Sequence, residues 1–262
     1  MYYYVSTQDE WVINALRWLP TNKVIIISGP PGTGKTSLAG IIAQNFGYAE
    51  EYYLCVADTT WEDLTLFLDP SRVAAKMAGL GVEDCYVPGP LLRAVEKSKK
   101  GGCVLTLDEL DKARERVDAY LLDFLQNGRV IDQLGRVWLA DMSKLIVVIT
   151  TNDQRPLNDA LLRRAIRYRK DFLPPNVEID VLRKRTGAPT GFLRALVACV
   201  NELRKSGTPV SLYEMERFTR VSLEVTKREE LEFYFNAFLL RETVSCKNYI
   251  SILWGELRRG NR

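Results

Sequence analysis

Residues 24–40 read VIIISGPPGTGKTSLAG, and this stretch decides the fold. Four apolar residues lead into a glycine-rich loop, and a run with helical character follows the loop. The loop GPPGTGKT (29–36) matches G-x-x-x-x-G-K-[ST] in full, between a predicted strand and a predicted helix, which is the context that supports the motif. The stretch therefore predicts a loop that binds nucleotide phosphates. A glycine-rich turn with a chance lysine is the weaker alternative.

Each fixed residue type of this loop has a physical role. Glycines let backbone N–H groups turn toward phosphate oxygens, and the helix that follows points its positive end at the same anion. Lys35 would supply a positive charge to the β- and γ-phosphates, and Thr36 would offer its hydroxyl to Mg²⁺. The candidate nucleotide-binding residues are Gly29, Pro30, Pro31, Gly32, Thr33, Gly34, Lys35, Thr36 and Ser37.

An acidic pair ends a second apolar run, CVLTLDE (103–109). A phosphate-binding loop needs a carboxylate on a neighbouring strand to hold the metal, so Asp108 is a candidate outer-shell ligand of Mg²⁺ beside Thr36. Glu109 would polarise the attacking water. The alternative is a strand that ends in a solvated acidic turn.

A later apolar run, VVITTND (147–153), also ends in polar residues. Asn152 at its tip is a candidate for orienting the attacking water together with Glu109. Asparagine at a strand end is more often a turn residue, and both interpretations stay open at this point.

Apolar runs alternate with helical patterns over the first 175 residues, which predicts an α/β fold with a parallel sheet covered by helices on both faces. After LPPN (173–176) only helical patterns follow, so we expect a core of residues 1–175 and a small helical domain of residues 176–262. The expected strands are 23–28, 52–58, 103–109, 144–153 and 166–172. The expected helices include 9–19, with Trp11, Val12, Ala15, Leu16 and Leu19 on its apolar face, 35–47, 89–102, 114–128, 157–165, 192–207 and 227–242.

Composition narrows the class of protein. The chain has 262 residues, 47% hydrophobic and 26% charged, and it contains no histidine, which excludes Ser-His-Asp and Cys-His catalysis and histidine-bound metals. No apolar run reaches the length of a membrane span, and the N-terminus does not resemble a signal peptide. Five cysteines are scattered without a C-x-x-C pair, which favours a reducing, cytoplasmic location.

The net charge of +3 is unevenly distributed. Residues 1–159 carry 16 Lys and Arg against 21 Asp and Glu, whereas residues 160–262 carry 20 against 12. A basic C-terminal part is compatible with nucleic-acid binding, and a solvated helical surface with a few functional arginines is the simpler alternative.

In this order and spacing the motifs resemble those of the AAA+ ATPases, over roughly residues 20–175. Three stretches resemble the MoxR and dynein-related branch of that family: VADTTWEDL (56–64), the segment 88–135 from PGPLLRAVEK through DELDKA to DQLG, and VITTNDQRPLNDALLRRA (148–165). The branch also has a hairpin of the type NGRVIDQLGRVW (127–138) before the asparagine strand.

The resemblance implies a strand order of 5-1-4-3-2, a helical lid, and ATP with Mg²⁺ bound between the subunits of a ring, usually a hexamer. It places an arginine finger in ALLRRA (160–165), so that Arg163 or Arg164 would reach a neighbouring subunit's site; a basic surface face is the alternative. Where the family often has a sensor arginine in its lid, this chain has Tyr213. Arg217 lies four residues on and either substitutes for it or is a solvated helix residue.

Two segments would contact the substrate in such a ring, 67–89 and the hairpin 128–138. Candidate contacts in the hairpin are Arg129, Arg136 and Trp138, unless these residues only hold the hairpin together. Three functions follow as hypotheses. The first is a MoxR-like ATPase that remodels a protein or a macromolecular complex. The second is a nucleic-acid-directed AAA+ ATPase of the replication initiator or loader type, encoded by a virus or mobile element. The third is a non-hydrolysing scaffold, which the intact Lys35, Asp108 and Glu109 disfavour.

Overall fold

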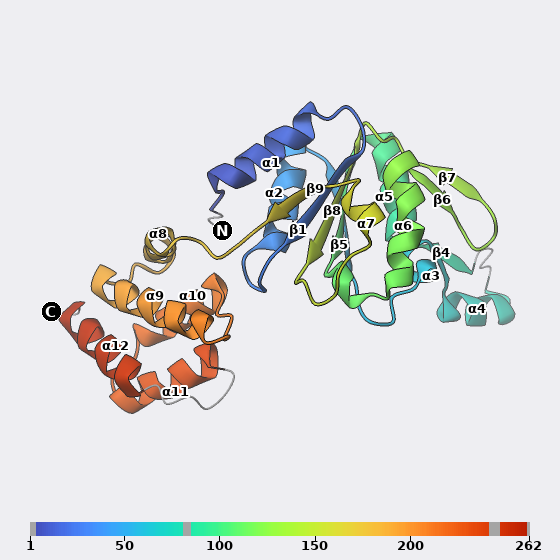
Figure 1. Ribbon diagram of the computed structural model, residues 1–262. Coiled ribbons are helices and arrows are strands. Elements are labelled where there is room, and N and C mark those ends of the chain that lie inside the picture. Colours follow the sequence, from blue (N-terminus) through green and yellow to red (C-terminus); the bar gives the residue numbers. More distant parts are fainter. Residues whose placement is uncertain (1–3, 81–84, 241–246, 261–262) are drawn as a thin grey trace. The chain divides into compact units, whose positions relative to one another are not determined.

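The computed structural model describes residues 4–80, 85–240 and 247–260. The chain divides into two compact units (Figure 1). Val5–Gly29 and Gly34–Lys170 form the sheet unit, and Asp171–Arg262 form the helical unit together with Tyr4 and Pro30–Thr33. The assignment of residues 1–175 as a nucleotide-binding core and of 176–262 as a lid remains a prediction.

A five-stranded parallel sheet is the centre of the sheet unit. Its strands are β1 (Lys23–Ser28), β2 (Ala49–Leu54), β5 (Cys103–Asp108), β8 (Leu145–Thr151) and β9 (Ile166–Arg169). They lie in the order β2-β5-β8-β1-β9, and every neighbouring pair is parallel. Counted along the chain this is 2-3-4-1-5, which is the predicted 5-1-4-3-2 taken from the opposite edge. The predicted α/β fold of a P-loop NTPase is confirmed.

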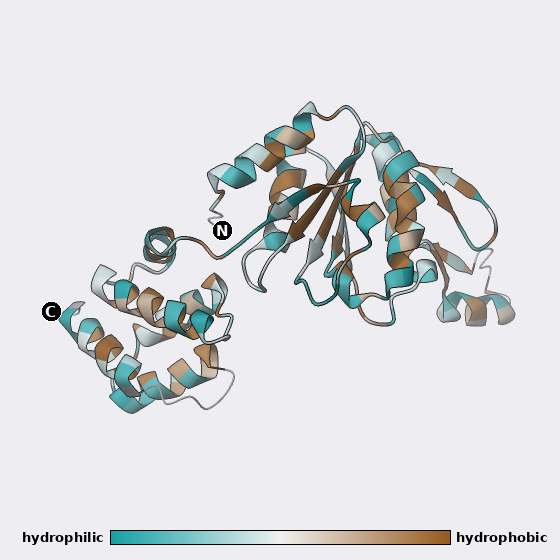
Figure 2. Cartoon of the chain, viewed as in Figure 1, coloured by the Kyte–Doolittle hydropathy of each residue, from teal (hydrophilic) through white to brown (hydrophobic). Residues whose placement is uncertain are grey.

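Helices cover both faces of this sheet, as Figure 1 shows. They are α1 (Thr7–Trp18), α2 (Lys35–Phe46), α5 (Pro90–Lys100) and α6 (Glu115–Asn127). Alternate residues of β1 face opposite ways: Ile25 and Ile27 join a buried cluster with α1 and α2, whereas Val24 and Ile26 join another with α5 and α6. The central strands are largely apolar (Figure 2), as expected of strands that are buried on both faces.

Short elements complete the sheet unit. They are α3 (Trp61–Leu64), β3 (Leu66–Leu68), α4 (Pro70–Met77), β4 (Tyr86–Pro88), the 3₁₀ helix η1 (Leu110–Lys112), β6 (Arg129–Ile131), β7 (Val137–Leu139) and α7 (Asp159–Leu162). Strands β3 and β4 form one antiparallel pair, and β6 and β7 form the predicted hairpin.

Two sequence predictions in this unit are corrected. The second strand begins at Ala49 and not at Tyr52, because β2 is an edge strand whose polar Glu51 is buried by ion pairs with Arg93 and Lys97 of α5. The apolar face of α1 does not include Trp11, which is 65% exposed. Val12, Ile13 and Leu16 are the residues that α1 packs against α2 and β1, which leaves Trp11 on its outer side.

The helical unit has its own core. Its helices are α8 (Pro175–Thr186), α9 (Thr190–Lys205), α10 (Leu212–Ser222), α11 (Arg228–Leu239) and α12 (Lys247–Gly260). Phe192, Phe218 and Phe235 are fully buried, and Phe218 contacts both other rings. A buried ion pair at 2.8 Å joins Glu178 of α8 to Arg204 of α9. Burial raises the pKa of Glu178, and the guanidinium of Arg204 opposes that shift.

Within the described residues no helix combines the length and the apolar character that crossing a membrane requires. In the same part of the chain Cys55, Cys85, Cys103 and Cys199 form no disulfide, whereas Cys246 lies outside the described residues. Burial raises the pKa of the Cys55 and Cys103 thiols to about 12, so these side chains are core residues.

Candidate functional site

The loop between β1 and α2 has the backbone of an anion site. Gly29, Gly32 and Gly34 have positive φ angles of 138°, 80° and 86°, which residues with a Cβ rarely adopt. A Cβ at Gly29 would also lie 2.1 Å from the backbone oxygen of Lys170. Gly34 caps α2 without a side-chain hydrogen bond, so the first N–H groups of the helix and its positive end are available to an anion.

Lys35 lies across the base of this loop and is 6% exposed. Its Nζ atom donates to the backbone oxygen of Gly29 and to Oδ1 of Asn152, both at 2.7 Å. Burial lowers the pKa of Lys35, and the carboxylates of Glu109 and Asp108 oppose this shift. The ammonium group is therefore fixed beside two acidic side chains and the loop.

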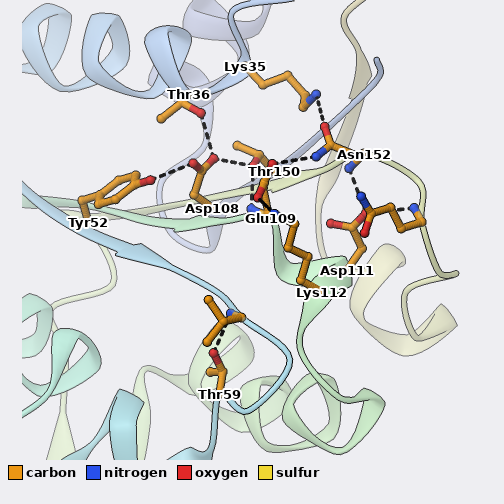
Figure 3. Close-up of polar contacts among 12 residues, drawn as sticks. Lys35, Thr36, Tyr52, Thr59, Asp108, Glu109, Asp111, Lys112, Thr150 and Asn152 are labelled. Carbon is orange, nitrogen blue, oxygen red and sulfur yellow. Dashed lines mark hydrogen bonds and ion pairs between the residues drawn. The ribbon is translucent and has the colours of Figure 1, made fainter. Parts of the chain in front are cut away.

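Asp108 ends β5, and its carboxylate is held by hydroxyl groups from α2, β8 and β2 (Figure 3). Its Oδ1 atom accepts from Oγ1 of Thr36 at 2.8 Å and from Oγ1 of Thr150 at 2.6 Å. Its Oδ2 atom accepts from the phenol of Tyr52 at 2.8 Å. Since Asp108 is 7% exposed, these donors replace water around the carboxylate.

Glu109 follows Asp108 in a left-handed conformation with φ at 55°. Its backbone N–H donates to Oγ1 of Thr150 at 2.9 Å, which anchors it to β8. Nδ2 of Asn152 donates to its Oε1 atom at 2.7 Å, and Lys112 forms an ion pair with its Oε2 atom. That contact is the main reason that the pKa of Lys112 is raised. Both carboxylate oxygens of Glu109 are thus engaged.

Asp111 fixes the loop that carries Asn152. Its Oδ2 atom accepts the backbone N–H groups of Asn152 and Gln154, both at 2.9 Å. Its Oδ1 atom is buried and has no hydrogen-bond partner among the described residues. The structure thus brings together Lys35, the Asp108–Glu109 pair and Asn152, which the sequence placed on three separate elements.

The residues of this site fit a nucleoside triphosphate with Mg²⁺. The positive-φ glycines leave room for phosphates beside the start of α2, and Lys35 supplies a cation. Thr36 and Asp108 offer a hydroxyl and a carboxylate within 2.8 Å of each other. These are the oxygen ligands that Mg²⁺ takes together with substrate phosphates and water.

The two candidate finger arginines differ in their surroundings. The Arg164 guanidinium donates to the backbone oxygen of Ala160 at 2.6 Å and to Oε1 of Gln126 at 2.7 Å. Arg163 is exposed, and its side chain makes no hydrogen bond or ion pair within the described residues. In the same part of the chain, neither guanidinium contacts the Asp108–Glu109 pair.

Most of the other candidate residues have partners nearby. In the hairpin, Arg136 and Trp138 both donate to the buried carboxylate of Asp132, and Arg129 donates to Asp123 of α6. These contacts favour the alternative in which the residues hold the hairpin together. In the helical unit, Arg217 lies over the ring of Tyr213, at 5.6 Å from its centroid.

The sequence did not single out Tyr52, Thr150, Asp111 or Lys112. The one usable signal was the position of Thr150 near the end of an apolar strand, since Asp108 also ends such a strand. Parallel strands that end together bring these residues to one edge of the sheet. Tyr52 gave no signal, because its contact with Asp108 depends on the register of β2 against β5.

Comparisons with known proteins agree with this arrangement. Residues 24–165, more than half of the chain, match the family model described as AAA domain (dynein-related subfamily). The chain is 28% identical over 216 residues to a Thauera aromatica protein named "Putative chaperone BssE", which covers 78% of this chain and 71% of that protein. It is 31% identical over 131 residues to the chaperone protein ClpB of Bacillus cereus. It is also 32% identical over 155 residues to the mitochondrial Lon protease homolog of Yarrowia lipolytica.

These alignments differ in the share of each protein that they cover. The ClpB alignment covers 48% of this chain but 14% of ClpB, and the Lon alignment covers 55% of this chain and 12% of that protein. The chain therefore spans only a small part of the length of these two longer proteins. With its parallel sheet, glycine-rich loop and family match, the chain belongs to the dynein-related subfamily of AAA domains.

Proposed function

We propose that this chain is an ATPase that acts as a subunit of a ring and remodels a protein or a macromolecular complex. The observation that carries the proposal is the network that joins Lys35, Asn152 and Glu109 beside the clamped Asp108. A loop that bound phosphate only to stabilise the fold would not need a glutamate held by an asparagine, as Glu109 is by the bond of 2.7 Å from Nδ2 of Asn152 to its Oε1 atom. ATP rather than another nucleotide is the expectation from the family.

The residues of the network divide the work of hydrolysis. Lys35 and the N–H groups at the start of α2 bind the phosphates, and Thr36 and Asp108 would hold Mg²⁺. Bound Mg²⁺ neutralises charge that develops on the phosphate oxygens. Glu109 accepts a proton from the attacking water. Nδ2 of Asn152 donates to Oε1 of Glu109 and so aligns the carboxylate. The ion pair between Lys112 and Glu109 must break before Oε2 of Glu109 can bind the attacking water.

Arg163 is the better of the two candidate fingers. A finger must reach a phosphoryl group on another subunit, so its guanidinium has to be available in its own subunit. Arg163 is exposed, whereas Arg164 is bound to Ala160 and Gln126. Arg163 follows α7 and does not contact Glu109 within the described residues, so as a finger it would complete the site of a second copy of the chain.

Remodelling of a protein or complex is proposed from the relatives named as chaperones. The alternative is a nucleic-acid-directed AAA+ ATPase, which the basic C-terminal part suggested. Many of its cations have acidic partners: Arg204 pairs with Glu178, and Arg185 and Arg220 both pair with Glu216. These contacts leave less free positive charge for DNA than the sequence count implies, and they favour the first function.

The test is steady-state ATP hydrolysis over a protein dilution series, with and without single- and double-stranded DNA. We expect activity per subunit to rise with concentration and to be indifferent to DNA. Arg163→Ala should lower the rate about 10³-fold, as in other NTPases that lose a finger. Arg164→Ala, the matched control, should stay within about threefold, because exposed contacts of this kind are worth about 1 kcal/mol or less.

Two results would contradict the proposal. Activity per subunit that is independent of concentration, and unaffected by Arg163→Ala, would show a site complete in one chain. Stimulation by DNA that salt abolishes would favour the nucleic-acid-directed alternative.

A further inference from the structure

We propose that Tyr52 is a positioning residue of the metal site, which holds the Asp108 carboxylate in the orientation that Mg²⁺ requires. The inference rests on the proposed function and adds a residue to it. The observation behind it is the hydrogen bond of 2.8 Å from the Tyr52 phenol to Oδ2 of Asp108 (Figure 3).

The strand register explains how this contact forms. Tyr52 of β2 lies opposite Thr106 of β5, and Asp108 lies two residues further along β5 on the same face. The tyrosine side chain is long enough to span this diagonal, and its phenol lies 2.8 Å from Oδ2 of Asp108. The shorter Ser or Thr would not reach the carboxylate from this position, so the contact is specific to the tyrosine.

The arrangement of donors assigns Tyr52 a separate role from the two threonines. Thr36 and Thr150 both donate to Oδ1 of Asp108, and Tyr52 is the donor to Oδ2. A carboxylate has about four lone-pair sites, so about one, on Oδ2, remains for a water on the metal. When the Thr36 hydroxyl turns to the metal, Thr150 and Tyr52 still hold one oxygen each and prevent the carboxylate from rotating.

The chemistry of the pair suits this role. A phenol O–H is a neutral donor, so it can hold a carboxylate oxygen without bringing a second cation to the metal site. Tyr52 is 51% exposed, and little of its ring contributes to the core. Loss of the hydroxyl should therefore change the metal site more than the fold.

The experiment measures binding and not turnover. The affinity for a fluorescent ADP analogue is determined in EDTA and at a series of Mg²⁺ concentrations, for the whole chain and for Tyr52→Phe. The control is Tyr53→Phe, because the neighbouring Tyr53 packs against the buried cluster on the other face of the sheet. Thermal unfolding checks that each variant is folded.

We expect Tyr52→Phe to bind the analogue normally in EDTA and to need about tenfold more Mg²⁺ for the tightening that the metal gives, in the range found when a residue that hydrogen-bonds a metal ligand is replaced. Tyr53→Phe should match the unmodified chain. An unchanged Mg²⁺ dependence in Tyr52→Phe, or weaker binding already in EDTA, would overturn the inference. If the unmodified chain does not bind the analogue, the proposed function itself fails, which separates the two ideas.

Discussion

Glu109 is held in the site through both its backbone and its side chain. Its backbone has a positive φ of 55°, its N–H group is bonded to Thr150, and its two carboxylate oxygens contact Asn152 and Lys112. A strained conformation of this kind costs on the order of 1 kcal/mol or more and persists where the surroundings enforce it. In the proposed mechanism the contact with Asn152 aligns the carboxylate, whereas the ion pair with Lys112 competes with the water that Glu109 would activate.

Replacement of Lys112 should therefore raise basal ATP turnover. We expect Lys112→Gln to increase the rate by up to about fivefold, since an exposed ion pair is worth about 1 kcal/mol at most. The raised pKa of Lys112 means that the pair is fully formed below the ordinary value of 10.5 and is lost only above it, so the increase should be constant from neutral to mildly alkaline pH. The pH profile of turnover for both proteins checks this.

Arg116→Gln is a suitable control, because Arg116 is also exposed but contacts Tyr120 and not Glu109. A Lys112→Gln rate equal to or below that of the unmodified chain would contradict the competition between Lys112 and water.

At the residue level the sequence predicted the parts of the site that belong to one continuous motif. The phosphate-binding loop from Gly29 to Thr36 needed only the order of residues, and so did Asp108 with Glu109. The partners Tyr52, Thr150 and Lys112 depend on strand register and on the turn after β5, which no single stretch encodes. For the same reason the sequence left Arg163 and Arg164 equivalent, whereas their contacts distinguish them.

At the level of elements, the ends of β5 and β8 build the site. Both strands run parallel and end at the same edge of the sheet, so Asp108 and Thr150 meet there. The alternation of apolar runs and helical patterns was sufficient to predict a parallel sheet. The order of its strands was predicted from the family resemblance. It was not sufficient to place β2, because an edge strand tolerates charged residues such as Glu51 when α5 supplies the counter-charges.

Helix α1 is attached to the base of the phosphate-binding loop by a buried ion pair. Both oxygens of Asp9 accept from Lys170, at 2.6 and 2.8 Å, and the Tyr168 phenol also donates to Asp9. Burial raises the pKa of Asp9, but the contacts with Lys170 and Ser6 outweigh it, so the pKa is lowered overall from 3.8. Its contribution to stability is therefore present above about that pH and is lost as the pH falls through the lower pKa of the folded state.

Asp9→Asn should destabilise the sheet unit by about 3 kcal/mol at pH 7, because it leaves the buried Lys170 without its counter-charge. The difference from the unmodified chain should begin to shrink as the pH falls below about 4, where the unfolded chain protonates Asp9, and should disappear only below the lower pKa of Asp9 in the folded state. Urea unfolding followed by far-UV circular dichroism measures this.

Glu10→Gln on the exposed side of the same helix is the matched control and should change stability by less than about 0.5 kcal/mol. Equal stability of Asp9→Asn and the unmodified chain at pH 7 would show that the pair with Lys170 does not hold α1 in place.

For the molecule as a whole, the proposed site is divided between two copies of the chain. One copy supplies the loop, Asp108 and Glu109, and its neighbour supplies Arg163. The sequence predicted this division only through the family resemblance, because no pattern within one chain shows what its exposed arginines contact in an assembly. It also overstated the free positive charge of the C-terminal part, since ion pairs such as Arg204 with Glu178 form only in the fold.

A mixing experiment tests the shared site. Glu109→Gln and Arg163→Ala subunits should each be inactive alone, but a mixture should hydrolyse ATP, because some interfaces then combine an intact Glu109 with an intact Arg163. Addition of Arg163→Ala to Lys35→Ala subunits should restore activity in the same way. A mixture no more active than its components would contradict a site shared between copies.

We propose that Glu109 drives hydrolysis at the nucleotide site that Lys35 and the glycine-rich loop form. The most direct test compares phosphate release and nucleotide binding in the unmodified chain and in Glu109→Gln. We predict that the variant binds ATP with Mg²⁺ as tightly as the unmodified chain and releases phosphate at least about 100-fold more slowly, the smallest contribution expected of a general base. Unchanged phosphate release in the variant would contradict the account and would leave a nucleotide that serves only to stabilise the fold.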